Sequence, residues 1–93
     1  MLEKQIERKL VAEARRRGGA AIKFTSPGCA GVPDRLVVMP GGKMGFVEVK
    51  APGRSPRPLQ TARRRQMERL GACVFVLDDP DSVGGAIDAI CAS

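Results

Sequence analysis

The chain has 93 residues, enough for one small domain with a single core, and we expect residues 1–93 to form that one domain. Its 16 Lys and Arg residues outnumber its 10 Asp and Glu residues, giving a net charge of +6, and it contains no His. The missing His excludes Ser-His and Cys-His catalysis, so an enzyme with this sequence must use carboxylates, lysine or a metal ion.

The composition also narrows the cellular setting and the partner. No apolar run approaches the length of a membrane span, and the N-terminus lacks the apolar stretch of a signal peptide, so we expect a cytoplasmic protein without a membrane partner. Three widely spaced cysteines argue against a disulfide framework. The basic balance predicts nucleic acid as the partner. With only three Phe and no Tyr or Trp, duplex phosphates are better targets than stacked bases.

The first predicted element is an amphipathic helix over residues 2–17. Its apolar stripe consists of Leu2, Ile6, Leu10, Val11 and Ala14. Glu3 falls close to the middle of this stripe, where a carboxylate either serves a site or complements the helix dipole from the first turn; both readings stay open. Arg15 and Arg16 precede the Gly pair that ends the helix, and they suit both the helix C-terminus and contact with phosphates.

A short strand is predicted over residues 20–25, with Lys23 inside it. A lysine within a strand usually protects a sheet edge. If its side chain shares a face with an acidic cluster, Lys23 could instead approach a scissile phosphate. The following residues, 26–31, are small and form a flexible loop that a nucleic-acid backbone could approach closely.

The most informative stretch is a predicted β-hairpin between residues 34 and 50, with its turn at Gly41-Gly42. Asp34 opens the first strand, and Glu48 and Lys50 end the second. Residues two apart on a strand share a face, and the start of one antiparallel strand lies beside the end of its partner. The hairpin therefore brings two carboxylates and one ammonium together at one end.

Such a cluster is costly unless it has a function, because neighbouring carboxylates repel each other and resist burial. A hard cation such as Mg²⁺ relieves the repulsion, and a nearby lysine can orient a water or neutralise charge on a phosphate. Glu-x-Lys alone is common and usually marks a surface ion pair. Its combination with Pro33-Asp34 ahead of the partner strand is much rarer and favours a site.

Beyond the hairpin, residues 51–58 form a proline-rich basic loop next to this cluster. Arg54 and Arg57 are candidates for bidentate phosphate contacts, although either could belong to a solvated linker. A helix is predicted over residues 58–70, with Gln60 in its first turn as a candidate site residue. Its apolar side consists of Leu59, Ala62, Met67 and Leu70.

The chain ends with a strand and a helix. Residues 72–77 are continuously apolar, which is typical of a strand buried on both faces, and the strand–helix–strand order predicts that it runs parallel to the strand of Glu48. An acidic turn over residues 78–82 caps a final helix at residues 83–92. The order α-β-β-β-α-β-α predicts an α/β (α+β) fold, a mixed sheet flanked by helices.

Pro33-Asp34 followed by Glu48-Val49-Lys50 resembles the signature of the PD-(D/E)xK nucleases. The finer pattern is similar to the virus-type replication-repair nuclease (VRR-NUC) domain over nearly the whole chain, as found in stand-alone phage or bacterial members. The matching pieces are Glu3 with Ile6, Lys23, residues 31–34, residues 46–50, and Gln60.

The resemblance implies a restriction-endonuclease-like core and a set of roles. Asp34 and Glu48, helped by Glu3 and the Val49 carbonyl, would ligate Mg²⁺ or Mn²⁺; Lys50 would position the attacking water, and Gln60 would be an accessory residue. It implies hydrolysis of a DNA phosphodiester without a small-molecule cofactor. Among substrates, it favours a four-way junction resolved by a homodimer. A flap or nicking endonuclease and a catalytically silent DNA-binding module are the alternatives.

Overall fold

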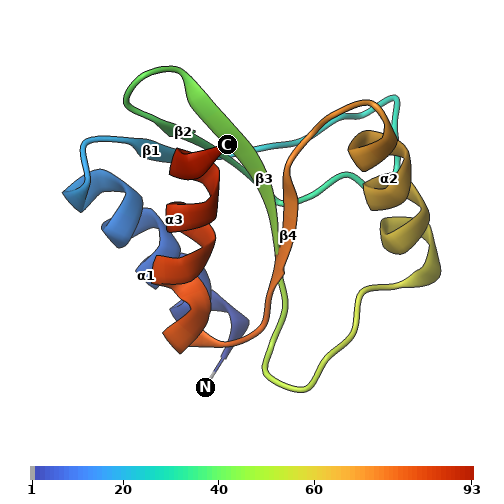
Figure 1. Ribbon diagram of the computed structural model, residues 1–93. Helices are drawn as coiled ribbons and strands as arrows, with labels where there is room; N and C mark the ends of the chain where they lie inside the picture. The colour runs from blue at the N-terminus through green and yellow to red at the C-terminus, as the bar shows by residue number, and fades with distance from the viewer. Residues whose placement is uncertain (1) are drawn as a thin grey trace.

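The computed structural model describes residues 2–93 and contains a four-stranded mixed sheet with helices on both faces (Figure 1). The sheet order is β1-β2-β3-β4, in which the first three strands are antiparallel and β3 runs parallel to β4. The helices are α1 (Glu3–Arg16), α2 (Pro58–Arg69) and α3 (Val83–Ala92); the strands are β1 (Ala20–Lys23), β2 (Arg35–Met39), β3 (Lys43–Val49) and β4 (Val74–Leu77). This order and the parallel β3–β4 pair confirm the predicted fold class.

The hairpin between β2 and β3 forms where the sequence places it. Gly41 and Gly42 have φ values of +85° and +77°, in the left-handed region that residues with a Cβ rarely adopt. The register pairs Met39 with Lys43 at the turn and Arg35 with Val47 near the other end. The next pair in this register, beyond the end of β2, is Asp34 with Glu48. The turn glycines therefore help to set which acidic residues meet.

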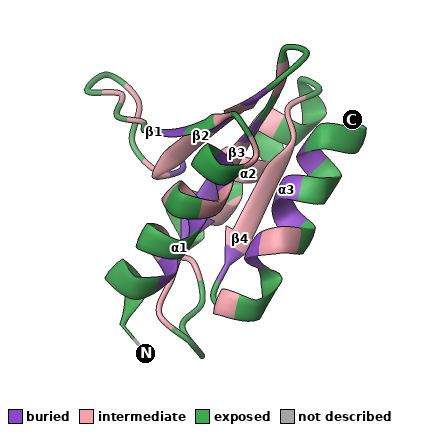
Figure 2. Ribbon diagram, turned by 90° about the vertical axis from the view of Figure 1, so that its left-hand side faces the viewer, coloured by how far each residue is buried: buried purple, intermediate pink, exposed green. Residues whose placement is uncertain are grey.

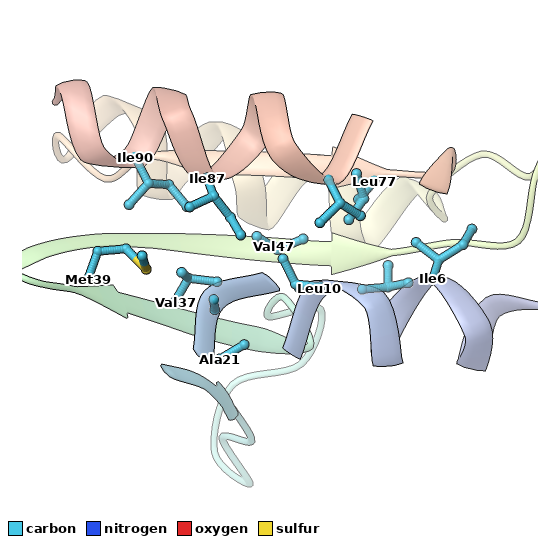
Figure 3. Packing of buried hydrophobic residues seen from close by; sticks show 12 residues of the cluster. Ile6, Leu10, Ala21, Val37, Met39, Val47, Leu77, Ile87 and Ile90 are labelled. Atoms are coloured by element: carbon cyan, nitrogen blue, oxygen red, sulfur yellow. The ribbon is translucent and has the colours of Figure 1, made fainter. Parts of the chain in front are cut away.

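Helices α1 and α3 cover one face of the sheet and form the apolar core with it (Figure 3). Ile6 and Leu10 of α1 and Ile87 and Ile90 of α3 are completely buried against Val47 and its neighbours. Gly45 sits under α3 so closely that a Cβ there would lie 2.6 Å from Ile90 Cγ1. Figure 2 shows the buried residues gathered between these two helices and the sheet. This face supplies most of the hydrophobic stabilisation.

Helix α2 lies on the other face and packs much less deeply (Figure 1). Its predicted apolar side is wrong: Leu59 is 52% exposed and Leu70 is 82% exposed, and Gln60 is the buried residue of the helix. The reason is that the first turn points the amide of Gln60 at the sheet. The prediction that β4 is buried on both faces is also wrong, because α2 packs shallowly on its face of the sheet and leaves Val74 and Val76 only half-buried.

Several element ends differ by a few residues from the prediction. Leu2 was expected in the stripe of α1, yet it precedes the helix and is 71% exposed. The acidic turn contains a short 3₁₀-helix at Pro80–Ser82, in which the side chain of Asp79 accepts a hydrogen bond from the backbone N–H of Asp81 at 2.9 Å. None of the helices in residues 2–93 combines the length and the hydrophobicity that a membrane-spanning helix needs.

Candidate active site

The candidate site lies at the end of β3, on the face covered by α2. Val47 and Val49 point into the core on the α1 and α3 side, so Glu48 between them points to the opposite side. Glu48 is only 4% exposed, and Gln60 is the other polar residue buried in the part of the chain described. One strand thus serves the core with alternate residues and carries a buried carboxylate between them.

Asp34 is held beside Glu48 by two backbone contacts. Its carbonyl oxygen accepts a hydrogen bond from the N–H of Phe24 at 2.8 Å, which fixes the residue at the start of β2. Its Oδ2 accepts a hydrogen bond from the N–H of Val49 at 3.0 Å. The side chain therefore takes the place of a backbone partner at the point where β2 begins, and this keeps the carboxylate at the end of β3.

Two side chains bind one oxygen of Glu48 and leave the other free. Gln60 Nε2 donates to Glu48 Oε2 at 2.7 Å, and Lys50 Nζ lies 3.3 Å from the same oxygen. Glu48 Oε1 is buried and has no hydrogen-bond partner. A buried carboxylate oxygen without a partner is costly in a folded protein. Oε1 is thus available to a ligand that contributes positive charge.

The electrostatics of Glu48 match this geometry. Burial, followed by the nearby negative charge of Asp34, raises the pKa of Glu48 to about 7, while Lys50 acts in the opposite direction. Such a shift means that the folded protein disfavours the ionised form of Glu48. Any bound cation that neutralises the pair would reverse this preference.

Gln60 links the site to the basic loop. Its Oε1 accepts a hydrogen bond from the backbone N–H of Arg57 at 2.9 Å, while its Nε2 binds Glu48. Both ends of the amide are used, so Gln60 fixes the start of α2, the end of the loop and one carboxylate oxygen together. Its position in the first turn and its match to the VRR-NUC pattern were the sequence features that indicated a site role for it.

A groove of about 430 Å³ opens beside Lys50 and contains the remaining candidates from the loop and α1. Its lining residues are Glu3, Lys50, Ala51, Arg54, Ser55 and Arg57. Arg54 and Arg57 are exposed there, as a phosphate contact requires. Glu3 is also exposed, in the first turn of α1. Within residues 2–93 no three Asp, Glu, Cys or His side chains gather as a metal site, so the carboxylates that converge are Asp34 and Glu48.

Three other candidates lie away from this point. Lys23 pairs with Arg35, and Arg35 pairs with Val47, so all three side chains lie on the face of the sheet covered by α1. The side chain of Lys23 therefore does not share the face of Glu48. Arg16 is bound to Glu13 with its Nε 2.9 Å from Oε1, whereas its neighbour Arg15 is exposed and makes no ion pair within residues 2–93. The structure therefore distinguishes two arginines that the sequence treats alike.

Comparisons with known proteins agree with this architecture. Acyrthosiphon pisum secondary endosymbiont phage 1 has a protein named "Putative nuclease p44", which is 53% identical over 79 residues, covering 85% of each chain. A solved structure described as a VRR_NUC domain superposes with a TM-score of 0.86 at 29% identity, covering 95% of this chain and 97% of the other. A scan against protein-family models finds no match.

Proposed function

Since the chain belongs to the VRR-NUC family of nucleases, we propose that it is a metal-dependent endodeoxyribonuclease whose active centre is built from Asp34, Glu48 and Lys50. The observation that carries the proposal is the buried Glu48 with one oxygen free and Asp34 beside it. Purely structural carboxylates are normally satisfied on both oxygens. Two neighbouring carboxylates, one of which has an oxygen without a hydrogen-bond partner, suit a ligand of positive charge.

The residues fit a hard divalent cation, Mg²⁺ or Mn²⁺, because such ions prefer carboxylate oxygens. Asp34 and Glu48 would hold it, with Glu3 and the Val49 carbonyl as further candidates. Once bound, it would lower the pKa of a water and offset charge on the phosphate. Glu3 lines the adjoining groove, so a contribution from it would require movement of the first turn of α1 or an intervening water.

The chain's own side chains supply the other parts of the reaction. Lys50 is mostly buried, with 16% of its side chain exposed, and it lies between Glu48 and the groove. Its ammonium is placed to hold the attacking water and to stabilise negative charge on the phosphoryl oxygens. Gln60 keeps the Glu48 carboxylate in one orientation. The water oxygen forms a bond to phosphorus as one P–O ester bond breaks. The water loses a proton, and the leaving ester oxygen takes up a proton to become a hydroxyl group.

We further propose a homodimer acting on a four-way junction, because two active sites related by a twofold axis suit a symmetric branched substrate. The face of the sheet opposite α1 and α3 supports this proposal. On that face Ile22 is 52% exposed and Met44 is 56% exposed, and the register places Leu36, Val38 and Phe46 beside them. With a net charge of +6 repelling a second copy elsewhere, an uncharged apolar face is the favourable place for two chains to meet.

The decisive experiment is a cleavage assay on a labelled four-way junction with Mg²⁺ or Mn²⁺, using linear duplex and flap DNA as controls. Paired symmetric cuts that disappear in Glu48→Ala would support a junction resolvase. Preferential cutting of the flap, or a single nick, would instead support a flap or nicking endonuclease. Binding to all three DNAs without cleavage under either metal would indicate a catalytically silent DNA-binding module.

The dimer is tested separately by light scattering during size-exclusion chromatography. Met44→Glu should convert a dimer to a monomer, because it places a charge in the apolar face without disturbing a buried residue. Leu70→Glu is the matched control, since Leu70 is even more exposed but lies at the end of α2. An unchanged dimer in Met44→Glu would rule out this face.

A further inference from the structure

A second basic groove lies along the outer surface of α1, on the side of the sheet opposite that of Glu48. It has a volume of about 300 Å³ and is lined by Glu7, Arg8, Val11, Ala12, Arg15 and Arg35. Three arginines surround it against one glutamate, so it carries an excess positive charge. Between Arg8 and Arg15 the helix presents only the small side chains of Val11 and Ala12, which leaves room for a chain of phosphates to approach.

The three arginines of this groove differ in how firmly neighbouring residues hold them. Arg35 NH2 lies 3.4 Å from Glu7 Oε1, and its NH1 donates to the carbonyl oxygen of Ala21 at 3.1 Å. Its Nε is buried with no hydrogen-bond partner, and only 17% of the side chain is exposed. By contrast, Arg8 and Arg15 are exposed, and neither forms an ion pair within residues 2–93. One fixed guanidinium and two available ones make a site for anionic oxygens.

The spacing of the two exposed arginines supports the same conclusion. Arg8 and Arg15 are seven residues apart, so they lie on one side of α1 and are separated by about 10 Å along its axis. Nearby arginines outside the groove are already neutralised: Glu13 binds both Arg16 and Arg17, and Arg17 also pairs with Asp88. The acids of this region therefore leave the positive charge of the groove largely unbalanced.

Helix α1 contributes lining residues to both this groove and the groove beside Lys50. Glu3 lines the groove beside Lys50, and Glu7, one helical turn later, lines the second groove. Figure 1 shows the N-terminal end of α1 at the same end of the sheet as the loop that follows β3. From Glu3 to Arg15 the helix rises by about 18 Å, which corresponds to roughly five nucleotides of one DNA strand.

We propose that the groove formed by Arg8, Arg15 and Arg35 binds the DNA backbone to one side of the reacting phosphate, so that α1 serves as a phosphate-binding track. This inference rests on the proposed nuclease function for the position of the cut, but DNA binding along the track does not require cleavage. The contacts are to phosphates, so they contribute affinity and register without selecting a base sequence.

The test compares two double variants that remove the same charge. Arg8→Ala/Arg15→Ala and Arg65→Ala/Arg69→Ala each lower the net charge to +4, and all four arginines are exposed on helix surfaces. Binding to a labelled DNA duplex is measured in EDTA over a series of salt concentrations. The first variant should reduce the salt slope by about two, at roughly 0.9 per lost phosphate contact, and the second should change it much less. Equal effects would overturn the proposal in favour of general charge attraction.

A substitution of opposite sign provides a second test. Glu7→Gln removes the only acid of the groove and should tighten DNA binding several-fold, whereas Glu68→Gln on α2 gives the same net charge of +7 and should tighten it less. Equal tightening by both would contradict a local site. Far-UV circular dichroism checks that each variant is folded.

Neutral methylphosphonate linkages locate the contacted phosphates. Placed one at a time, they should weaken wild-type binding on one side of the cut, and the same linkages should cost nothing further in Arg8→Ala/Arg15→Ala. If the linkages weaken DNA binding by that variant as much as they weaken binding by the wild type, the proposed track is wrong. Absence of cleavage by the wild-type protein under either metal would refute the proposed function and leave this inference standing. Cleavage by the wild type together with unchanged DNA binding by the groove variants would refute this inference alone.

Discussion

The two faces of the sheet are built differently from the same strands. The face under α1 and α3 is closed and apolar, with Ile6, Leu10 and Ile87 completely buried. The face under α2 buries Glu48 and Gln60 and leaves large apolar residues such as Ile22 and Met44 exposed. In β3 the division falls between successive residues, because Val47 and Val49 belong to one face and Glu48 to the other.

This difference indicates how so small a chain can remain folded with a buried carboxylate in its site. Burying a carboxylate whose pKa is raised to about 7 disfavours folding when that group is ionised. The opposite face supplies the hydrophobic stabilisation that offsets this cost. Because alternate residues of one strand serve the two tasks, changes on one face should leave the other largely intact. The predictions below test that separation, beginning with the largest effect.

The largest expected effect is loss of cleavage when the site face is changed. Asp34→Ala and Lys50→Ala should each reduce single-turnover cleavage by at least ~100-fold, since each removes a charge that acts on the reacting phosphate or its metal. The far-UV circular dichroism spectrum and DNA binding should remain. Full activity in either variant would refute the site assignment, and unfolding would refute the separation of the two faces.

The reciprocal change is made in the core. Leu10→Ala should destabilise the fold by about 2–5 kcal/mol, because it removes a completely buried side chain and leaves a cavity. Urea denaturation measures the change, and cleavage per folded molecule at low temperature should be preserved. Leu2→Ala, at an exposed position next to the same helix, serves as the control. A loss of specific activity at full folding would show that the faces are coupled.

The sequence allowed the fold order and the meeting of Asp34 with Glu48 to be predicted, because both follow from short-range rules. Because side chains alternate along a strand, Glu48 points to the face of the sheet opposite that of Val47. The glycine turn sets the register that brings Asp34 beside Glu48. Relatives confirm the family and the nuclease identity. The roles of Asp34, Glu48 and Lys50 remain predictions until the variants are assayed.

The orientation of elements that bury little could not be predicted in this way. Helix α2 has no dominant apolar stripe, so periodicity did not show that Gln60, and not Leu59, faces the sheet. Likewise, the face on which Lys23 lies depends on the pairing of β1 with β2, which no local motif specifies. The basic groove on α1 required both helix spacing and the position of Arg35, a residue from a different element.

A smaller effect concerns the stability of the site face itself. The raised pKa of Glu48 means that the folded state holds this proton more tightly than the unfolded state, so stability falls as pH rises from about 4.5 to about 7. Glu48→Gln should remove this fall and stabilise the metal-free protein at pH 8. The shift sets an upper limit of about 3 kcal/mol, which solvent screening at the groove reduces to about 1 kcal/mol.

Thermal unfolding in EDTA at pH 5 and pH 8 measures this difference. At pH 8 the Tm of Glu48→Gln should exceed that of the wild type by about 4–8 °C, and at pH 5 the gap should be much smaller. Addition of Mg²⁺ should raise the Tm of the wild type more than that of the variant, because the ion binds the folded state. A gap that does not depend on pH would exclude a titrating Glu48 as its cause.

The smallest predicted effect separates the site groove from the rest of the basic surface. Arg54→Ala and Arg57→Ala should each weaken DNA binding and lower the salt slope by about one, because each removes one contact to a phosphate. Cleavage at saturating DNA should fall little, since neither side chain touches Glu48 or Asp34. Arg65→Ala, which is equally exposed on α2 but lies outside the groove, is the matched control. If all three slopes fall equally, the loop arginines act only through the net charge. If only the loop variants respond, the site face contains both the reacting groups and the contacts that bring DNA to them.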